Sequence, residues 1–151
     1  MSRETATILT NMCMIYDNQG RVLVQDKVGS NWCGVTFPGG HVEAEESIVD
    51  STIREIKEET GLDISDLKIC GIKDWTYAQG SRYVVFLYKT NKFSGQLQPS
   101  KEGPVYWVDL KELKHLKLAP SMAIMLEVFL RDDVSEHFIY QENGVWKDSL
   151  K

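Results

Sequence analysis

Three glutamates in the sequence have the type and spacing needed for metal chemistry. Glu55, Glu58 and Glu59 stand at positions i, i+3 and i+4, so on a helix of about 3.6 residues per turn their carboxylates share one narrow stripe. Like charges at these spacings destabilise a helix by about 0.2–0.5 kcal/mol per pair, and Arg54 and Lys57 are the nearby charges that offset them. Converging carboxylates suit Mg²⁺ or Mn²⁺. The stripe therefore predicts a divalent-metal site, and the alternative is an ordinary solvated helix face.

The helix that must position these glutamates is expected from about Ser47 to Thr60. Ser47, with Asp50 three residues later, resembles a capping box, and Gly61 stands where a helix stops. The loop containing Phe37-Pro-Gly-Gly40 should lie beside the carboxylates. A neighbouring stripe is expected to seat the helix on a sheet, and it consists of Val49, Ile53, Ile56 and Thr60.

Outside this helix the sequence has mainly the patterns of strands. A second helix is expected at Ser121–Arg131, and Asn143-Gly144 predicts a hairpin turn within His137–Lys147. The mixture of strands with two separated helices predicts one α+β domain over residues 1–151, in the form of an α/β/α sandwich. The remaining expected strands are Ala6–Tyr16, Arg21–Lys27, Leu67–Tyr77, Ser81–Thr90 and Val105–Val108.

Composition limits the partners of this domain. The 17 basic and 22 acidic side chains give a net charge of -5, which repels polyanions and argues against binding to a nucleic-acid polymer. No run of 18 apolar residues and no signal-peptide core is present, so we expect a cytoplasmic protein without a membrane partner. The three cysteines lack CxxC spacing and are expected to be reduced thiols. We expect a monomer or a homodimer, and the charge does not exclude a small phosphorylated ligand, because a carboxylate cluster can hold divalent cations that bridge protein and phosphate.

The residues around the glutamate stripe resemble the complete signature of the Nudix hydrolase family. Gly40, five residues, Glu46, seven residues and then Arg54–Leu62 fill every specified position of that pattern. The resemblance implies a Nudix-type α/β/α sandwich with a mixed central sheet. It also implies an enzyme that uses Mg²⁺, or Mn²⁺, to cleave the diphosphate linkage of a nucleoside-diphosphate compound.

The same resemblance implies roles for individual residues. Glu58 and Glu59 match the principal metal ligands, and Glu55 matches a position that serves as ligand or general base. The carbonyl of Gly39 matches a backbone ligand, and a glycine there leaves the backbone open to a metal. Arg54 would orient the carboxylates by ion pairing.

Two further residues resemble positions of the MutT-type nucleoside triphosphate pyrophosphohydrolases. Glu102, in Ser100-Lys-Glu-Gly103, matches a loop that supplies one more glutamate to the metals, and it is the second candidate for the base after Glu55. Lys27 matches a basic position that contacts phosphate. For each, a solvated surface side chain is the alternative.

The substrate pocket is expected around the polar loop that contains Trp32, whose indole could stack on a purine. Gly40 and His41 are candidates for phosphate contacts. Where MutT-type enzymes that clear 8-oxo-dGTP place a purine-reading amide or acid, this chain has Ser121 and Met122. Other aromatic candidates, which more often belong to a core, are Trp75, Tyr77 and Phe86.

The expected reaction is hydrolysis of a purine (d)NTP, oxidised or not, to (d)NMP and pyrophosphate, by metal-assisted substitution at phosphorus. ADP-ribose, NADH or a dinucleoside polyphosphate are alternative substrates, because they would require the same glutamate helix. An alternative of another class is an inactive Nudix-like module that senses a nucleotide.

Overall fold

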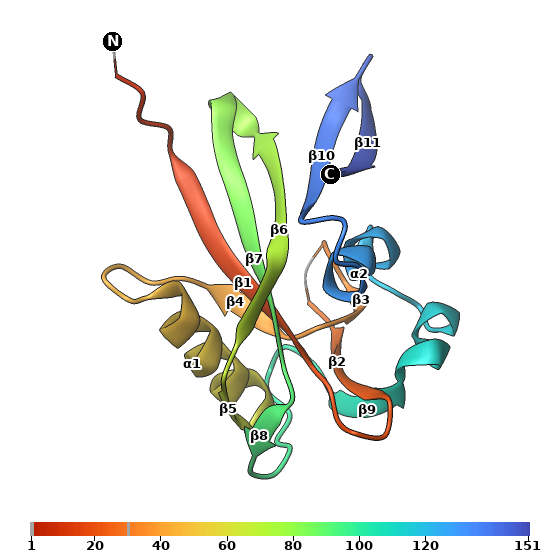
Figure 1. The fold of residues 1–151 in the computed structure, drawn as a ribbon. Coiled ribbons are helices and arrows are strands. Elements are labelled where there is room, and N and C mark those ends of the chain that lie inside the picture. The colour runs from red at the N-terminus through yellow and green to blue at the C-terminus, as the bar shows by residue number, and fades with distance from the viewer. Residues whose placement is uncertain (1, 30) are drawn as a thin grey trace.

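A mixed six-stranded sheet forms the centre of the computed structural model, which describes residues 2–29 and 31–151 (Figure 1). Its strand order is β11-β10-β6-β7-β1-β4. The β1·β7 and β6·β10 pairs are parallel and the other neighbours are antiparallel. These strands are β1 (Thr7–Ile15), β4 (Gly39–His41), β6 (Lys68–Tyr77), β7 (Ser81–Thr90), β10 (Glu136–Glu142) and β11 (Val145–Leu150).

Two smaller sheets and two α-helices complete the described part of the chain. One sheet has the order β3-β2-β9, from β2 (Arg21–Lys27), β3 (Gly34–Thr36) and β9 (Val105–Asp109), and the other pairs β5 (Asp63–Ser65) with β8 (Lys92–Ser94). The helices are α1 (Ile48–Thr60) and α2 (Met122–Leu130), with the 3₁₀ helices η1 (Ala78–Gly80) and η2 (Leu110–His115). No helix of these residues is long and apolar enough to cross a membrane.

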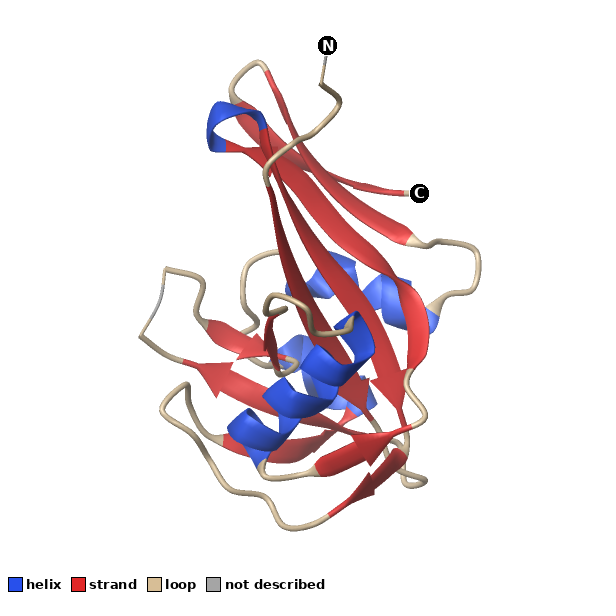
Figure 2. Ribbon diagram, turned by 90° about the vertical axis from the view of Figure 1, so that its left-hand side faces the viewer, coloured by secondary structure: helices blue, strands red, loops and turns tan. Residues whose placement is uncertain are grey.

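The two α-helices cover opposite faces of the central sheet. Figure 2 shows α1 lying across the long strands. Along β1, Cys13 and Ile15 face the side packed against α1, whereas Met12 and Met14 face the side packed against α2. This alternation is the two-residue period of a strand with apolar residues on both faces. The predicted sandwich with a mixed central sheet is confirmed.

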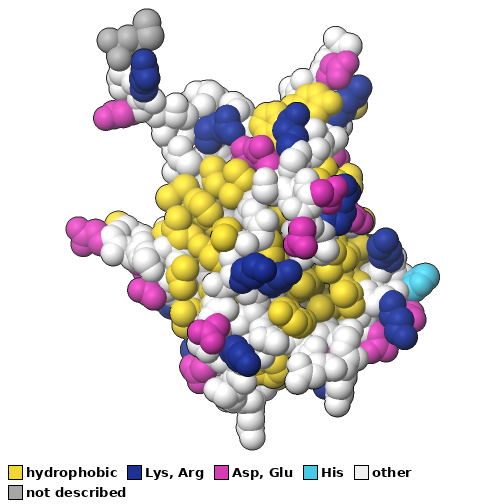
Figure 3. Space-filling model, in the orientation of Figure 1, with side chains coloured by type: hydrophobic (Ala, Val, Ile, Leu, Met, Phe, Trp, Pro, Cys, Tyr) yellow, Lys and Arg dark blue, Asp and Glu magenta, His cyan; other side chains and the backbone are white. Residues whose placement is uncertain are grey.

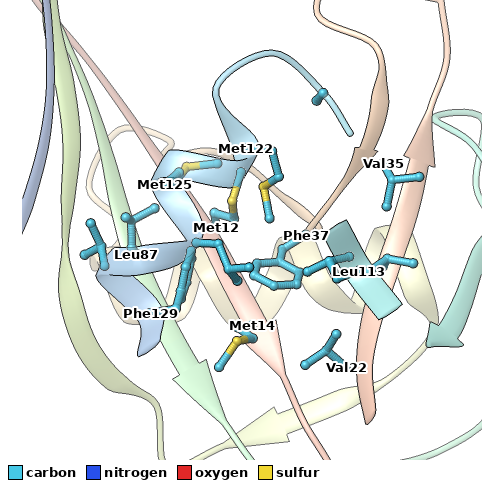
Figure 4. Close-up of a cluster of buried hydrophobic side chains, with 14 of the residues drawn as sticks. Met12, Met14, Val22, Val35, Phe37, Leu87, Leu113, Met122, Met125 and Phe129 are labelled. Atoms are coloured by element: carbon cyan, nitrogen blue, oxygen red, sulfur yellow. The ribbon is translucent and has the colours of Figure 1, made fainter. Parts of the chain in front are cut away.

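Phe37 lies at the centre of the core on the α2 side. It is 1% exposed, and its ring meets that of Phe129 edge-on, with centroids 5.1 Å apart. Figure 4 shows Met12 and Met122 beside it. Flexible methionine side chains fill the irregular space around the aromatic pair. This packing fixes the chain immediately before Gly39 and Gly40.

Helix α1 begins and ends as predicted, but its buried face differs from the predicted one. Ser47 Oγ accepts a hydrogen bond from the Asp50 N–H at 2.9 Å. Val49 is 39% exposed, so the prediction that it lies in the seating stripe is wrong. The buried positions are Ser51, Thr52, Ile56, Glu59 and Thr60. Hydroxyl groups are tolerated there because they donate to carbonyls within the helix.

The predicted hairpin at Asn143-Gly144 is confirmed, since φ is 53° and 76° at these residues and β10 pairs with β11 on either side. The short strands β3 and β4 occupy segments that the sequence pattern predicts as loop. Three residues are too few for a periodic pattern, so these strands depend on pairing with β2 and β1. Ser121 precedes α2 with φ of 65° and is not its first residue.

Candidate active site

The three predicted glutamates point in different directions from α1. The Glu59 residue is buried at 4% exposure, the Glu55 side chain is 16% exposed, and the Glu58 side chain is 59% exposed. Glu59 Oε2 accepts a hydrogen bond from the Gly39 N–H at 3.1 Å. The helix therefore directs Glu59 and Glu55 toward the Gly39-Gly40 strand, and Glu58 outward.

The contact between α1 and β4 requires a residue without a side chain at position 40. A Cβ on Gly40 would lie 2.2 Å from Glu55 Cδ, and one on Gly39 would lie 2.1 Å from the Asn11 carbonyl oxygen of β1. A side chain at position 40 would displace the Glu55 carboxylate, and one at position 39 would require the backbone of β1 or β4 to move. Gly40 thus lets the Glu55 carboxylate lie directly on the backbone of β4, and Gly39 lets β4 lie close to β1.

Asn11 connects three parts of the site from its buried position on β1. Its Oδ1 accepts a hydrogen bond from the Gly40 N–H at 3.1 Å, and its Nδ2 donates to Ser51 Oγ at 2.9 Å. Because Asn11 is 3% exposed, both bonds satisfy groups that water does not reach. The sequence interpretation missed this residue, although the polar pair Thr10-Asn11 interrupting an apolar strand was a signal.

Arg54 joins the charged side chains around the helix. Its Nε and Nη2 donate to the two carboxylate oxygens of Glu46 at 2.8 Å each, and Nη1 donates to Glu55 at 3.0 Å. A longer contact of 3.3 Å reaches Glu58, and Nη2 also donates to the His41 carbonyl at 3.0 Å. Arg54 hydrogen bonds lower the pKa of Glu46 to about 2. Planar bidentate pairing of this kind fixes orientation as well as charge.

The loop that carries Glu102 is fastened to β2 by its backbone. The Val28 N–H donates to the Glu102 carbonyl at 3.0 Å, and the Asp26 N–H donates to the Pro104 carbonyl at 2.9 Å. These bonds place the Glu102 side chain beside Lys27, whose Nζ donates to its Oε2 at 2.9 Å. The two residues predicted from the MutT-type resemblance are therefore in direct contact.

Glu102 also hydrogen-bonds Glu59, so carboxylates from the loop and from α1 meet. Burial, followed by this hydrogen bond, raises the pKa of Glu59, whereas the hydrogen bond from Lys27 lowers the pKa of Glu102. Two carboxylates in contact must share a proton or a cation. Hard anionic oxygens are the donors that Mg²⁺ and Mn²⁺ prefer. The donor set at this contact therefore fits a divalent cation.

The described residues do not form a complete metal cage, because no three His, Cys, Asp or Glu side chains among them converge around one point. Glu58, predicted as a principal ligand, lies on the exposed side with Arg54. The Glu55 carboxylate is also paired with Arg54, and its burial raises its pKa. A divalent cation shared by Glu58, Glu59 and Glu55 would require side-chain rotations.

A cavity of about 590 Å³ opens beside these carboxylates. Among the described residues, its lining includes every residue predicted to bind substrate, together with Glu55 and Glu102, whereas Glu58 and Glu59 lie outside the lining. Trp75 also lines the cavity. Tyr77 lines a separate surface pocket, and Phe86 packs against the core on the α1 side. The predicted substrate-binding residues in the lining are Lys27, Trp32, Gly40, His41 and Ser121.

The cavity extends across the central sheet from the glutamates to a group of aromatic rings. Trp32 Nε1 donates to the Pro120 carbonyl at 3.0 Å, which connects its loop to the segment before α2. Trp75 stacks on Tyr83, with centroids 4.4 Å apart and planes 11° apart. Lys73 lines the cavity between these elements and is 5% exposed. The sequence interpretation did not select Lys73, since strand register alone brings it to this face.

The chain is similar in sequence to known Nudix proteins over most of its length. The model of the NUDIX domain matches residues 8–129. The chain is 30% identical over 128 residues to YvcI of Bacillus subtilis, described as an uncharacterized Nudix hydrolase, covering 82% of this chain and 78% of that protein.

Solved structures share the fold over most of the chain. The mutator MutT protein of Bacillus halodurans superposes with a TM-score of 0.77 and 26% identity, covering 95% of this chain and 97% of that one. The NUDIX domain of Shewanella oneidensis NrtR, solved with ADP ribose, gives a TM-score of 0.66 at 17% identity, covering 85% and 88% of the two chains. The second likeness concerns the fold alone.

Proposed function

This chain belongs to the Nudix hydrolase family and is a pyrophosphohydrolase, and on that premise we propose that it converts a purine (d)NTP, oxidised or not, to (d)NMP and pyrophosphate with Mg²⁺ or Mn²⁺. The observation that carries this choice of substrate is the contact of Glu102 with both Lys27 and Glu59. It brings a loop carboxylate and a phosphate-binding candidate to the carboxylates of α1.

Metal ions held by Glu59, Glu102, Glu58, Glu55 and the Gly39 carbonyl would neutralise the diphosphate oxygens and acidify a bound water. The protein's own contribution begins with Arg54, which holds Glu55 and Glu46 in fixed orientations. The Gly39 N–H orients Glu59 through its hydrogen bond.

Proton transfer is assigned to Glu55, with Glu102 as the second candidate. Burial raises the pKa of Glu55, and a carboxylate with a raised pKa is a stronger base toward water. In the reaction one P–O bond of the α–β bridge breaks, one P–O bond forms to the water oxygen, and the water proton passes to the carboxylate. Lys27 lines the cavity beside Glu102, where its ammonium would bind a phosphate oxygen of the substrate.

The test is a substrate panel of dGTP, 8-oxo-dGTP, dATP, ADP-ribose, NADH and diadenosine tetraphosphate, with chromatographic identification of products. We expect triphosphates to give monophosphate and pyrophosphate with Mg²⁺, and chelation with EDTA to abolish the activity while leaving the melting temperature nearly unchanged. Undiminished hydrolysis in EDTA would overturn the metal requirement. A higher kcat/KM for ADP-ribose, together with a Glu102→Gln variant as active as wild type, would overturn the choice of substrate.

A further inference from the structure

One row of side chains crosses the cavity floor from the glutamates to Lys73. Strand pairing aligns His41 of β4 with Thr10 of β1, Thr10 with Val85 of β7, and Val85 with Lys73 of β6. Three strand spacings of about 4.8 Å separate the backbones of His41 and Lys73 by roughly 14 Å. Because both ends line one cavity, a ligand whose diphosphate lies at the glutamates can extend its base to Lys73.

Aromatic rings surround the Lys73 ammonium in place of carboxylates. Its Nζ lies 5.2 Å from the ring centroid of Trp32 and 5.6 Å from that of Trp75, within cation–π range. Within residues 2–29 and 31–151, Lys73 Nζ forms no hydrogen bond or ion pair. The charge of Asp148 acts on Lys73 and opposes the effect of burial on its pKa, but the Asp148 carboxylate contacts Nε2 of His137 at 2.6 Å. His137 is the residue of β10 that pairs with Lys73.

The Lys73 residue is buried apart from its contact with the cavity, so its ammonium loses most of its hydration and gains no acceptor from the described residues, which costs the folded protein free energy. Burial lowers the pKa of Lys73 to about 8, which leaves it mainly charged at pH 7. A ligand that supplies an acceptor here would offset the desolvation, and the flanking indoles favour a planar ring. The combination of a planar ring with acceptors on its edge describes a nucleobase.

We propose that Lys73 selects the base of the substrate by donating hydrogen bonds to O6 and N7 of a 6-oxopurine that stacks on Trp32. The proposal rests on the proposed function for the position of the diphosphate. Guanine and hypoxanthine present two acceptors on this edge, whereas adenine presents an amino donor at position 6. Adenine would therefore offer Lys73 one acceptor, N7, instead of two, and would place its amino donor against the ammonium.

The test measures binding of the monophosphates dGMP, dIMP and dAMP to the full chain in EDTA, by tryptophan fluorescence or calorimetry. We expect dGMP and dIMP to bind about 5- to 150-fold more tightly than dAMP. In Lys73→Met this ratio should fall close to one, and Lys73→Arg, which keeps the donors, should restore the preference. The matched control is Lys68→Met, an exposed lysine on the same strand, which should keep the wild-type ratio.

Equal affinity of wild type for dGMP and dAMP, or an unchanged ratio in Lys73→Met, would overturn the role of Lys73. A hydrolysis assay on the same protein distinguishes a failure of the inference about Lys73 from a failure of the proposed function. If base preference is present but no triphosphate is cut, the inference about Lys73 holds and the proposed reaction is wrong. If triphosphates are cut while the monophosphates bind without preference, the reaction holds and the inference about Lys73 is wrong.

Discussion

The cavity has a glutamate end, at Glu55 and Glu102, and a tryptophan end, at Trp32, Trp75 and Lys73, and the two ends differ in whether their charged side chains have partners of opposite charge. At the glutamate end, Arg54 pairs with Glu46 and Glu55, and Lys27 pairs with Glu102. At the tryptophan end, Lys73 has aromatic neighbours and no carboxylate within ion-pair distance among the described residues. One end thus holds its groups in place before any ligand arrives, whereas the other leaves an acceptor for the ligand to supply.

The surface around the cavity differs from both ends. Figure 3 shows hydrophobic side chains over the long strands and over α2, with charged side chains scattered between them. Exposed apolar residues in small separate areas are ordinary for a folded protein. Variants are therefore compared at the paired charges of the glutamate end and at the unpaired charge of the tryptophan end.

Replacing Glu59 is expected to have the largest effect. Glu59→Gln removes an anionic oxygen at the contact with Glu102 without changing the shape of the side chain. Loss of a residue that only supports a metal ligand lowers activity by up to about 100-fold. Because Glu59 is assigned as a ligand itself, we expect kcat to fall by more than that. The protein should still fold, which thermal melting would check. Glu112→Gln, at an exposed position, is the control. Wild-type turnover in Glu59→Gln at saturating Mg²⁺ would show that Glu59 is not a ligand.

Gly40→Ala should disturb the glutamate end from the backbone side. Its Cβ would lie 2.2 Å from Glu55 Cδ, so the carboxylate must move or the strand must shift. We expect kcat to fall by about 10- to 100-fold, as for loss of a supporting contact, with base preference unchanged at the distant tryptophan end. The control is Gly80→Ala, where a Cβ meets nothing within 4 Å, although the positive φ there adds strain. A Gly40→Ala enzyme with the wild-type rate would contradict the close approach.

Glu102→Gln and Lys27→Ala test separately the two partners of the Lys27–Glu102 ion pair, one assigned to the chemical step and the other to substrate binding. Glu102 is assigned to the cation, so its loss should lower kcat, whereas loss of a phosphate-binding lysine should mainly raise KM. Both side chains are partly exposed, at 48% and 25%, and we expect their melting temperatures to stay close to that of wild type. Steady-state kinetics on the preferred triphosphate would separate the effects. A rise in KM alone for both variants would contradict the assignment of Glu102.

Lys73→Met should alter the pH dependence of stability in the alkaline range. The folded pKa of Lys73, about 8, lies below its ordinary value of 10.5, so the unfolded chain binds more protons between these values. Stability of wild type should therefore gain from this group as pH rises from 8 to 10.5, by about 1–3 kcal/mol. Denaturant titrations at several pH values should show this gain lost in Lys73→Met, with higher stability than wild type at pH 7. If Lys73→Met were less stable than wild type at pH 7, Lys73 would instead stabilise the fold through an ion pair.

Glu46→Gln should produce the smallest effect, at acid pH. Hydrogen bonds from Arg54 and from the Glu43 N–H hold the pKa of Glu46 near 2, below the ordinary 4.5. Its contribution to stability is present above pH 4.5 and is lost as pH falls from 4.5 toward 2. The variant should therefore have a flatter stability profile over this range in urea titrations. Identical slopes for wild type and variant would show that the pair contributes nothing measurable.

The glutamate end was largely predictable because its determinants are local. Ser47 and Gly61 flank α1 as the capping pattern predicts, and the double glycine meets that helix directly. The side chains that seat the helix were predicted less well, since Val49 is exposed and small hydroxyl residues are buried. Close packing on β1 and β4 favours small side chains, and apolar periodicity does not reveal this.

The tryptophan end was mostly unpredictable, because it depends on strand register. The position of Lys73 follows from its alignment with Val85 and His137 across β7 and β10. A one-residue shift would turn its side chain to the other face of the sheet. Asn11 was missed for a similar reason, since its partners Gly40 and Ser51 come from later segments. Trp32 was selected for its polar loop, and it lines the cavity, but its contact with a base stays a prediction.

The most direct test of the central claim is a calorimetric titration of wild type and Glu59→Gln with Mn²⁺ at pH 7, in two buffers of different ionisation enthalpy. Burial and the contact with Glu102 raise the pKa of Glu59, so a cation that replaces the shared proton should release it on binding. We predict Mn²⁺ binding with proton release in wild type, and strongly weakened binding without proton release in Glu59→Gln. Equal affinity for Mn²⁺ in the two proteins would contradict a metal site built on the Glu59–Glu102 contact.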